Sequence, residues 1–340
     1  MARSLTNALD LSTEIAGLEL EHPVLNGSGT FDAIAALRAF GPELRDRFPF
    51  SAFVSKTITV APREGNPPPR LWETPAGMIN SIGLPNKGLD GFLEQDLPVL
   101  ATLPAPLVVS VAGFSHDEFA RLVEAVAAQE AAAALELNVS CPNVKSGCVM
   151  GAEPFETLAL LERLRPITSK PLIVKLTPNA SDVAAVAEAA EQGGADALSL
   201  INTLRSVAID PASGRPWLGA GSGGLSGPAV RAVALEQVLA VTARTSLPVI
   251  GMGGIRSGRD ALDFLAAGAS AVAVGTESFR DPAAAERVRD ELRALLCKRG
   301  ATRVTDAVAV AGAGPKAPTN AGQKSTCLMP SRPRNQVEPI

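Results

Sequence analysis

The chain of 340 residues has no tyrosine, two histidines and four cysteines. So few cysteines in a chain of this length do not make a disulfide scaffold. The spacing between Cys141 and Cys148 matches no common zinc or iron–sulfur motif, and neither histidine lies near them. We therefore expect no metal site. Proton transfer at an active site must use cysteine, serine, lysine or a carboxylate.

The chain also lacks an excess of basic residues and any apolar run of about 20 residues, the length that crosses a membrane. Its 31 Lys and Arg against 35 Asp and Glu give a net charge of −4, which disfavours a broad nucleic-acid surface. Arg3, Asp10 and Glu14 interrupt the N-terminus, so it resembles neither a signal peptide nor an anchor. We expect a cytoplasmic, soluble protein without nucleic-acid or membrane partners.

Short apolar runs alternate with amphipathic helical stretches through most of the chain. PLIVKLT at 171–177 is mostly apolar without strict alternation, as buried parallel strands are. Eight such strands predict an α/β fold of the (β/α)₈ TIM-barrel type, with a doubly wound sheet as the competing arrangement. The expected strands are 23–26, 51–57, 107–113, 134–140, 171–177, 197–202, 247–254 and 271–276.

Helices are expected at 181–192 and 258–267, with Ser181 and Ser257 as N-caps and Gly193-Gly194 as a helix stop. The catalytic barrel domain is expected at 11–300, after a flexible N-terminus at 1–10. Within it, residues 11–21 predict a hairpin or plug, and residues 60–90 a long functional insertion after the second strand. Residues 301–340 predict a low-complexity, disordered tail, most clearly from 314 onward.

Polar residues stand where several of these strands end, at the barrel face that carries active sites. A single buried lysine, which costs several kcal/mol unless it meets an anion or acceptor, could instead reach solvent at an edge. Two lysines and two asparagines that converge on one face indicate an anionic ligand with an amide-like edge. These strand-end residues are Lys56, Ser110, Asn138, Ser140, Lys175, Asn202 and Thr203.

Glycine turns follow the last two expected strands, at Gly253-Gly254 and Gly275-Thr276. Barrels commonly bind phosphate there, through backbone N–H groups. Gly227, in GSGGLSGP at 221–228, belongs to a third loop of this kind. Although glycine also serves plain turns, paired glycine loops after consecutive strands favour a phosphorylated cofactor.

Cys141 precedes a proline where the fourth expected strand meets a loop, and a thiol there can accept a proton. Residue type alone does not rank Cys141 above Cys148 as a catalytic base. Cys297 falls inside a predicted helix, where a buried structural cysteine is normally found.

In combination, these motifs resemble the dihydroorotate dehydrogenase family, specifically its soluble class 1 enzymes and most strongly class 1B. The resemblance covers residues 20–289. It is carried by SKT (55–57), RxGNPxPR (63–70), NSIGLPN (80–86), LNVSCPNVK (137–145), VKL (174–176), INT (201–203), GGLSGPA (223–229), GMGG (251–254) and AVAVGT (271–276).

This resemblance implies FMN-dependent oxidation of (S)-dihydroorotate to orotate in de novo pyrimidine (UMP) biosynthesis. Cys141 would take the C5 proton, FMN N5 the C6 hydride, and Lys175 would stabilise negative charge on the reduced flavin. The residues implied at FMN are Ser28, Lys56, Thr57, Ser110, Asn138, Lys175, Ile201, Gly227, Gly253, Gly254, Gly275 and Thr276. Those implied at the substrate are Lys56, Asn80, Ile82, Gly83, Leu84, Asn138, Asn143, Asn202 and Thr203.

The chain departs from the family pattern in three places: Ser110 replaces a usual asparagine, the loop at 145–150 differs, and the tail after Gly300 matches nothing. Class 1B implies a homodimer assembled with a subunit that carries FAD and a [2Fe–2S] cluster and delivers electrons to NAD. The alternatives are a fumarate-using class 1A homodimer, an enzyme like dihydropyrimidine dehydrogenase, a tRNA dihydrouridine synthase, or a degenerate barrel scaffold without activity.

Overall fold

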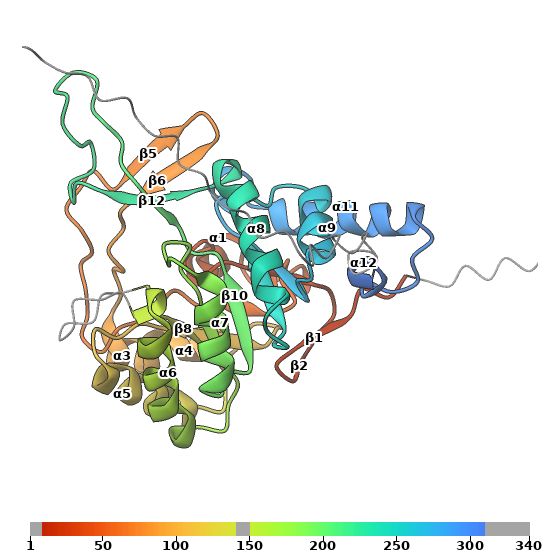
Figure 1. The fold of residues 1–340 in the computed structure, drawn as a ribbon, viewed down its shortest axis with the longest axis horizontal. Coiled ribbons are helices and arrows are strands. Elements are labelled where there is room, and N and C mark those ends of the chain that lie inside the picture. The colour runs from red at the N-terminus through yellow and green to blue at the C-terminus, as the bar shows by residue number, and fades with distance from the viewer. Residues whose placement is uncertain (1–8, 141–149, 310–340) are drawn as a thin grey trace, which may run out of the picture.

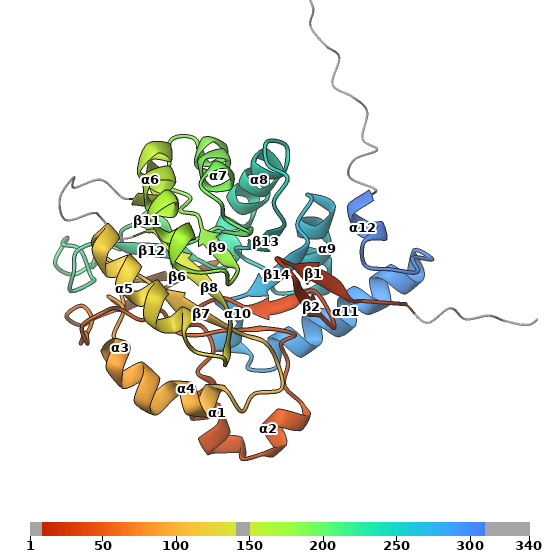
Figure 2. The same ribbon diagram turned by 90° about the horizontal axis from the view of Figure 1, so that it is seen from below.

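Eight parallel strands form one sheet whose spatial order follows the order of the chain (Figures 1 and 2). The structure is a computed structural model that describes residues 9–140 and 150–309. The predicted (β/α)₈ barrel is confirmed. Its strands are β3 (Val24–Asn26), β4 (Phe53–Val54), β7 (Leu107–Val111), β8 (Ala132–Asn138), β9 (Leu172–Lys175), β10 (Ala197–Leu200), β13 (Val249–Met252) and β14 (Ala271–Val274).

The two end strands of this sheet, β3 and β4, are joined by one backbone hydrogen bond and by the buried side chains of Ser51 and Asn26. The Ser51 N–H donates to the Val24 carbonyl at 3.1 Å. The Asn26 carboxamide donates to the Val54 carbonyl and accepts from the Val54 N–H, each at 2.8 Å. Asn26 therefore replaces a rung of the backbone ladder and closes the barrel.

Each predicted strand overlaps an observed one, although most observed strands are shorter and β8 begins two residues before its predicted start. The largest difference is at 51–57, where only Phe53–Val54 pairs as a strand. Beyond Val54 the chain already turns toward the carboxyl-terminal face, and Lys56 and Thr57 line a cavity there. Lys56 and Thr57 therefore belong to the wall of the site rather than to the sheet.

Helices cover the outside of the barrel, as Figure 2 shows for α5 to α9. The helices are α1 (Ala33–Phe40), α2 (Glu43–Asp46), α3 (Gly88–Gly91), α4 (Leu97–Leu100), α5 (His116–Ala127), α6 (Pro154–Leu164), α7 (Val183–Gln192), α8 (Arg231–Thr242), α9 (Gly258–Ala266), α10 (Glu277–Arg280), α11 (Ala284–Lys298) and α12 (Asp306–Ala309). Among the described residues, none of these helices is long and apolar enough to cross a membrane.

The predicted helix boundaries are partly right. Ser257 caps α9, since its hydroxyl accepts from the Asp260 N–H, and Gly193 ends α7 before Gly194 at φ 88°. The prediction of Ser181 as the other N-cap is wrong. Asp182 caps α7 and accepts from the Ala185 N–H at 2.9 Å. Aspartate caps at least as well as serine, so neighbouring candidates cannot be ranked from residue type.

The predicted N-terminal hairpin is confirmed, and it plugs the barrel. Strands β1 (Thr13–Ile15) and β2 (Leu18–Leu20) pair antiparallel. Ile15 and Leu20 are buried and belong to the same apolar cluster as the inward-facing residues of the barrel strands. The hairpin thus removes the inner apolar surface of the barrel from water.

A second, antiparallel sheet projects from the barrel at the upper left of Figure 1. Its order is β11 (Leu204–Ser206), β12 (Gly223–Ser226), β6 (Gly77–Asn80) and β5 (Leu71–Thr74). The insertion predicted at 60–90 supplies β5 and β6. Strands β11 and β12 were not predicted, and they belong to a second long insertion between β10 and α8.

The chain remains packed beyond residue 300, so the predicted tail boundary at 301 is too early. Val304 is buried, and its N–H donates to the Asp10 carbonyl at 2.9 Å. The Asp10 N–H in turn donates to the Thr302 carbonyl at 2.9 Å. The folded unit therefore includes residues 9 and 10 and residues 301–309, while residues 310–340 lie outside the described part.

Candidate active site

A cavity of about 600 Å³ opens at the carboxyl ends of the barrel strands, and the second sheet forms part of its wall. Its volume is typical of sites for cofactors and small ligands. The structure brings most of the predicted site residues to this one cavity: Ser28, Lys56, Thr57, Asn80, Ile82, Gly83, Leu84, Asn138, Lys175, Ile201, Asn202, Thr203, Gly227, Gly253, Gly254, Gly275 and Thr276.

Three predicted site residues are not on the described cavity wall. Cys141 and Asn143 lie outside the described residues, as does the rival Cys148. Ser110 is fully buried in β7 and does not line the cavity. It contacts the site through other side chains, so its influence on a ligand is indirect.

Lys175 ends β9 and is only 5% exposed. Its ammonium donates to the Ser28 hydroxyl at 2.9 Å and lies 3.8 Å from a carboxylate oxygen of Glu136. At an effective dielectric constant of about 20, opposite charges at that distance attract by about 4 kcal/mol, which offsets part of the cost of burying them. Lys175 thus presents a positive charge to the cavity with a counter-charge behind it.

Glu136 was missed by the sequence analysis, although a signal was available. It is the one charged residue in the apolar strand β8, and it precedes Asn138 by two positions, so both side chains point to the same face. Its Oε1 accepts from the Ser110 hydroxyl at 2.9 Å and its Oε2 from the Ser199 hydroxyl at 3.2 Å. A buried carboxylate therefore meets hydrogen-bond donors at both oxygens.

Side-chain amides form a connected group on the cavity wall. The Asn202 amide donates to Asn138 Oδ1 at 3.2 Å and to the Ser140 hydroxyl at 2.8 Å. The Asn138 amide donates to Thr57 Oγ1 at 3.4 Å. These bonds orient donors and acceptors from three barrel strands toward one ligand, as a flat heterocycle with amide edges requires.

The second sheet contributes a further amide and a backbone conformation that costs energy. Asn80, at the end of β6, donates to the Gly224 carbonyl of β12 at 3.2 Å. Leu84 lines the cavity at φ 55°, a left-handed conformation that residues other than glycine rarely adopt. Such strain persists where surrounding structure imposes it, and it is typical of ligand-binding loops.

The glycine turns after β13 and β14 form a cradle of backbone N–H groups. Within the described chain, no acceptor meets the N–H of Gly253, Gly254, Gly275 or Thr276. Gly254 has φ 78°, and a Cβ there would lie 2.8 Å from the Gly227 carbonyl oxygen. The backbone of Gly227 thus lies too close to Gly254 for a side chain at position 254. The free N–H groups fit an anion such as a phosphate.

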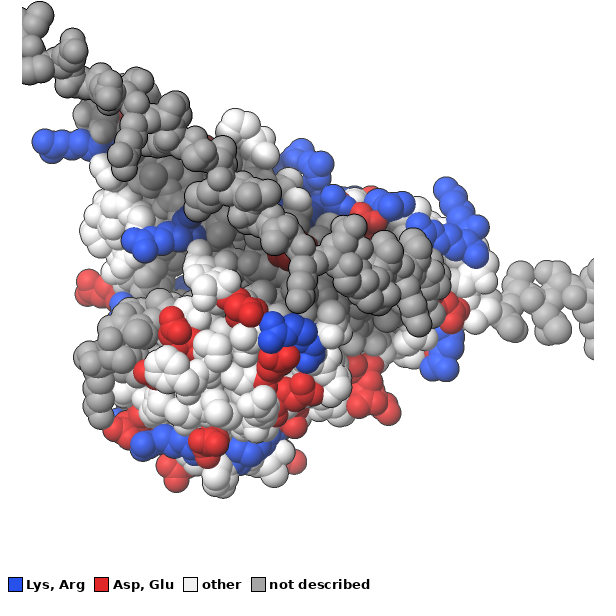
Figure 3. Space-filling view, in the orientation of Figure 1, with Lys and Arg blue, Asp and Glu red and all other residues white. Residues whose placement is uncertain are grey.

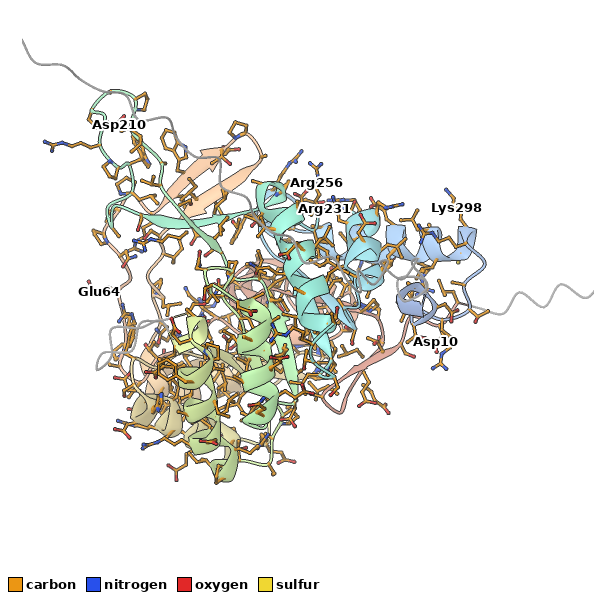
Figure 4. All side chains as sticks on the ribbon, viewed as in Figure 1. Asp10, Glu64, Asp210, Arg231, Arg256 and Lys298 are labelled. Atoms are coloured by element: carbon orange, nitrogen blue, oxygen red, sulfur yellow. The ribbon has the colours of Figure 1, made fainter. Side chains whose placement is uncertain are left out.

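Two further cations line the cavity. Neither Lys56 nor Arg256 makes a side-chain hydrogen bond or ion pair with the rest of the described chain. Figure 4 labels Arg256 and also Arg231, the residue at which α8 begins. Arg231 pairs with Asp260 and Asp263, so it is neutralised. Arg256 was not predicted, although it follows the Gly253-Gly254 pair by two residues.

Titratable groups elsewhere do not join the site. His22 lies beneath β3, where burial first, and then the charges of Arg289 and Arg293, lower its pKa to about 4. Cys297 lies in α11 as expected, but it is exposed rather than buried. On the face drawn in Figure 3, acidic and basic side chains are interspersed over the outer helices.

A closed α/β barrel with cations, amides and an anion cradle at the carboxyl ends of its strands defines a TIM-barrel enzyme. Comparison with known proteins agrees. The family model for dihydroorotate dehydrogenase matches residues 10–296. The chain belongs to the dihydroorotate dehydrogenase family, whose members are flavin-dependent oxidoreductases.

Two curated relatives and one solved structure illustrate this membership. The catalytic subunit of dihydroorotate dehydrogenase B (NAD⁺) from Geobacter metallireducens is 45% identical over 303 residues, which cover 88% of this chain and 97% of that protein. The same subunit from Desulforudis audaxviator is 48% identical over 298 residues, 87% of this chain and 96% of the relative. The crystal structure of the Eimeria tenella enzyme in complex with ferulenol has a TM-score of 0.73 at 26% identity and covers 92% of both chains.

Proposed function

We propose that this chain binds FMN, oxidises (S)-dihydroorotate to orotate in de novo pyrimidine biosynthesis and passes the electrons to NAD⁺ through a partner subunit. The family membership and the names of the relatives support this function. The single observation that carries it is the gathering of buried Lys175, the amides and the glycine cradle in one cavity.

The residues fit FMN. The free N–H groups of Gly253, Gly254, Gly275 and Thr276 would hold its phosphate, because they meet no acceptor in the described chain and line one cavity. Lys175 would stabilise negative charge on the flavin ring, because it lines the cavity and its ammonium donates to the hydroxyl of Ser28, another residue of the cavity wall. When bound, FMN supplies the acceptor for the hydride that leaves C6 of dihydroorotate.

The residues also fit a pyrimidine that carries a carboxylate. The free ammonium of Lys56 would bind the carboxylate. Asn80, Asn138 and Asn202 would pair with the ring N–H and carbonyl groups, as would Asn143, which lies outside the described residues. Ile82, Gly83 and Leu84 would enclose the ring from the loop after β6, and Thr203 from the segment between β10 and β11.

Cys141 would act as the base that takes the C5 proton. It lies outside the described residues, and three features support the assignment. It directly follows Ser140, whose hydroxyl accepts from the Asn202 amide on the cavity wall. The chain has no tyrosine, and neither His22 nor His116 lines the cavity. A cysteine thiolate is a competent proton acceptor near neutral pH.

In our proposal, transfer of the electrons to NAD⁺ requires a second protein. Among the described residues, no group of three or more His, Cys, Asp or Glu side chains could hold a metal ion. Two relatives bear the name of a catalytic subunit of an NAD⁺-linked enzyme. The assembly we propose is a homodimer of this chain with a subunit that carries FAD and a [2Fe–2S] cluster.

Orotate and uracil binding test the substrate assignment. The FMN-loaded protein is titrated with each ligand while the flavin spectrum is recorded. Orotate should bind at least tenfold more tightly than uracil, because only orotate has the carboxylate for Lys56. A Lys56→Met variant should lose most of that difference. Equal binding of the two ligands to the unaltered protein would instead favour a dihydropyrimidine dehydrogenase-like enzyme.

The acceptor is tested by separate assays of the chain alone and with the partner subunit. Our proposal predicts that NAD⁺ is reduced only when the partner is present, and that fumarate does not support turnover of the chain alone. Rapid turnover of the isolated chain with fumarate would replace the partner model with the self-sufficient homodimer. A protein that takes up no FMN would be a scaffold rather than an enzyme.

A further inference from the structure

Glu136 is a buried carboxylate that the proposed function leaves without a role. It is 2% exposed in the centre of the barrel and, unlike Lys175, it does not line the cavity. Its Oε1 lies 3.8 Å from the Lys175 ammonium. The carboxylate therefore lies behind the lysine, on the side away from a ligand.

The surroundings of Glu136 suit a charged carboxylate. An ionised carboxylate only accepts hydrogen bonds, and the Ser110 and Ser199 hydroxyls donate to its two oxygens. Both serines are themselves fully buried. Burial of a charge without such partners would be costly. Here each carboxylate oxygen accepts a hydrogen bond from a serine, and the Lys175 ammonium supplies the opposite charge.

A directed chain of hydrogen bonds links Glu136 to the cavity wall. Because the Ser110 hydroxyl donates its proton to Glu136, the bond of 2.9 Å between Ser110 and Thr57 must have Thr57 as donor. Thr57 Oγ1 in turn accepts from the Asn138 amide at 3.4 Å. Glu136 is thus connected to the site twice, through Lys175 and through Thr57 and Asn138.

We propose that Glu136 is a positioning residue for Lys175 that holds the ammonium at Ser28 and offsets its charge, and so sets the reduction potential of the bound flavin. This inference rests on the proposed FMN site. With Glu136 charged, the buried pair is neutral overall, and the cavity experiences a dipole rather than a full positive charge. The carboxylate thereby limits how strongly Lys175 favours the reduced, negatively charged flavin.

The test is the two-electron reduction potential of bound FMN in a Glu136→Gln variant. Glutamine keeps the size of the side chain and removes the negative charge, so the Lys175 ammonium loses its counter-charge. Reduced FMN should then bind at least tenfold more tightly relative to oxidised FMN. This ratio corresponds to a rise in potential of about 30 mV. A purely structural role for Glu136 would lower thermal stability and leave the potential where it was.

Two matched variants make the test specific. Ser199→Ala removes a hydrogen bond to Glu136 without a change in charge, so the affinity ratio should change by less than threefold. Glu136→Gln/Lys175→Met removes both charges and leaves an uncharged pair that folds even if Glu136→Gln alone does not. Its potential should lie below that of the unaltered protein, because the positive charge nearer the flavin is gone, and at least about 30 mV, a tenfold affinity ratio, below that of Glu136→Gln.

Two results would overturn the inference. One is a Glu136→Gln protein that folds and binds FMN with an unshifted or lowered potential. The other is a double variant whose potential is not below that of the unaltered protein, because Lys175 would then not favour the reduced flavin and Glu136 would have no charge to offset. Failure of the proposed function looks different: the unaltered protein would bind no FMN, or dihydroorotate would not reduce it.

Discussion

Protonation of one side chain, His22, should contribute to the destabilisation of this fold by acid. The imidazole lies beneath β3 at 7% exposure, and its Nδ1 accepts from the Val24 N–H at 3.3 Å. Burial lowers the pKa of His22 to about 4, and the charges of Arg289 and Arg293 add to the shift. Protonation would place a second donor against the Val24 N–H at the base of the barrel seam.

The sign and size of the effect follow from this pKa. An unfolded histidine has a pKa of about 6.5, so the unfolded chain binds more protons than the folded chain between about pH 6.5 and 4. The stabilising contribution is complete above pH 6.5 and is lost as the pH falls toward 4. The full shift is worth about 3 kcal/mol, of which about 2 kcal/mol is lost by pH 5.

Urea unfolding at pH 8 and pH 5 measures this loss in the unaltered protein and in a His22→Asn variant. Asparagine retains an acceptor for the Val24 N–H and does not titrate. Every other titrating group is the same in the two proteins. The difference between their losses of unfolding free energy therefore reports His22 alone. The unaltered protein should lose about 2 kcal/mol more than the variant. Equal losses would refute the assignment of a buried, neutral His22.

Three further predictions concern the site and the barrel seam. Cys141→Ser should keep FMN and lose most turnover at neutral pH, measured under steady-state conditions; unchanged turnover would remove Cys141 from the mechanism. Lys175→Met should weaken FMN binding or slow flavin reduction in rapid-mixing experiments, and normal values of both would contradict its electrostatic role. Asn26→Ala leaves the N–H and the carbonyl of Val54 unpaired, so the free energy of unfolding in urea should fall by about 2–4 kcal/mol. Little change would mean that water replaces the amide.

Much of the site is predictable because it depends on strand ends. The carboxyl ends of parallel barrel strands converge on one face, so polar residues that are distant in sequence must meet there. Asn138 and Lys175 illustrate this, since they are register neighbours on β8 and β9. Local sequence therefore predicts the composition of the cavity wall once the strands are recognised.

The features that escaped prediction depend on non-local partners. Strands β11 and β12 are only three and four residues long, and β12 is rich in glycine; it is defined by pairing with β6, more than 140 residues away. Glu136 is buried because Ser110 and Ser199 on other strands satisfy it. Residues 301–309 lack periodicity, yet they pack because Val304 meets the N-terminal segment at Asp10. Apart from the single charge in the apolar strand β8, none of these features leaves a local pattern.

Anaerobic reduction of the bound flavin tests the central claim most directly. The isolated chain, loaded with FMN, is mixed with dihydroorotate in the absence of oxygen, and then in a separate sample with dihydrouracil. Our account predicts rapid loss of the visible flavin band with dihydroorotate and none with dihydrouracil, because only the former offers a carboxylate to Lys56. Bound flavin that dihydroorotate leaves oxidised would contradict the proposed reaction.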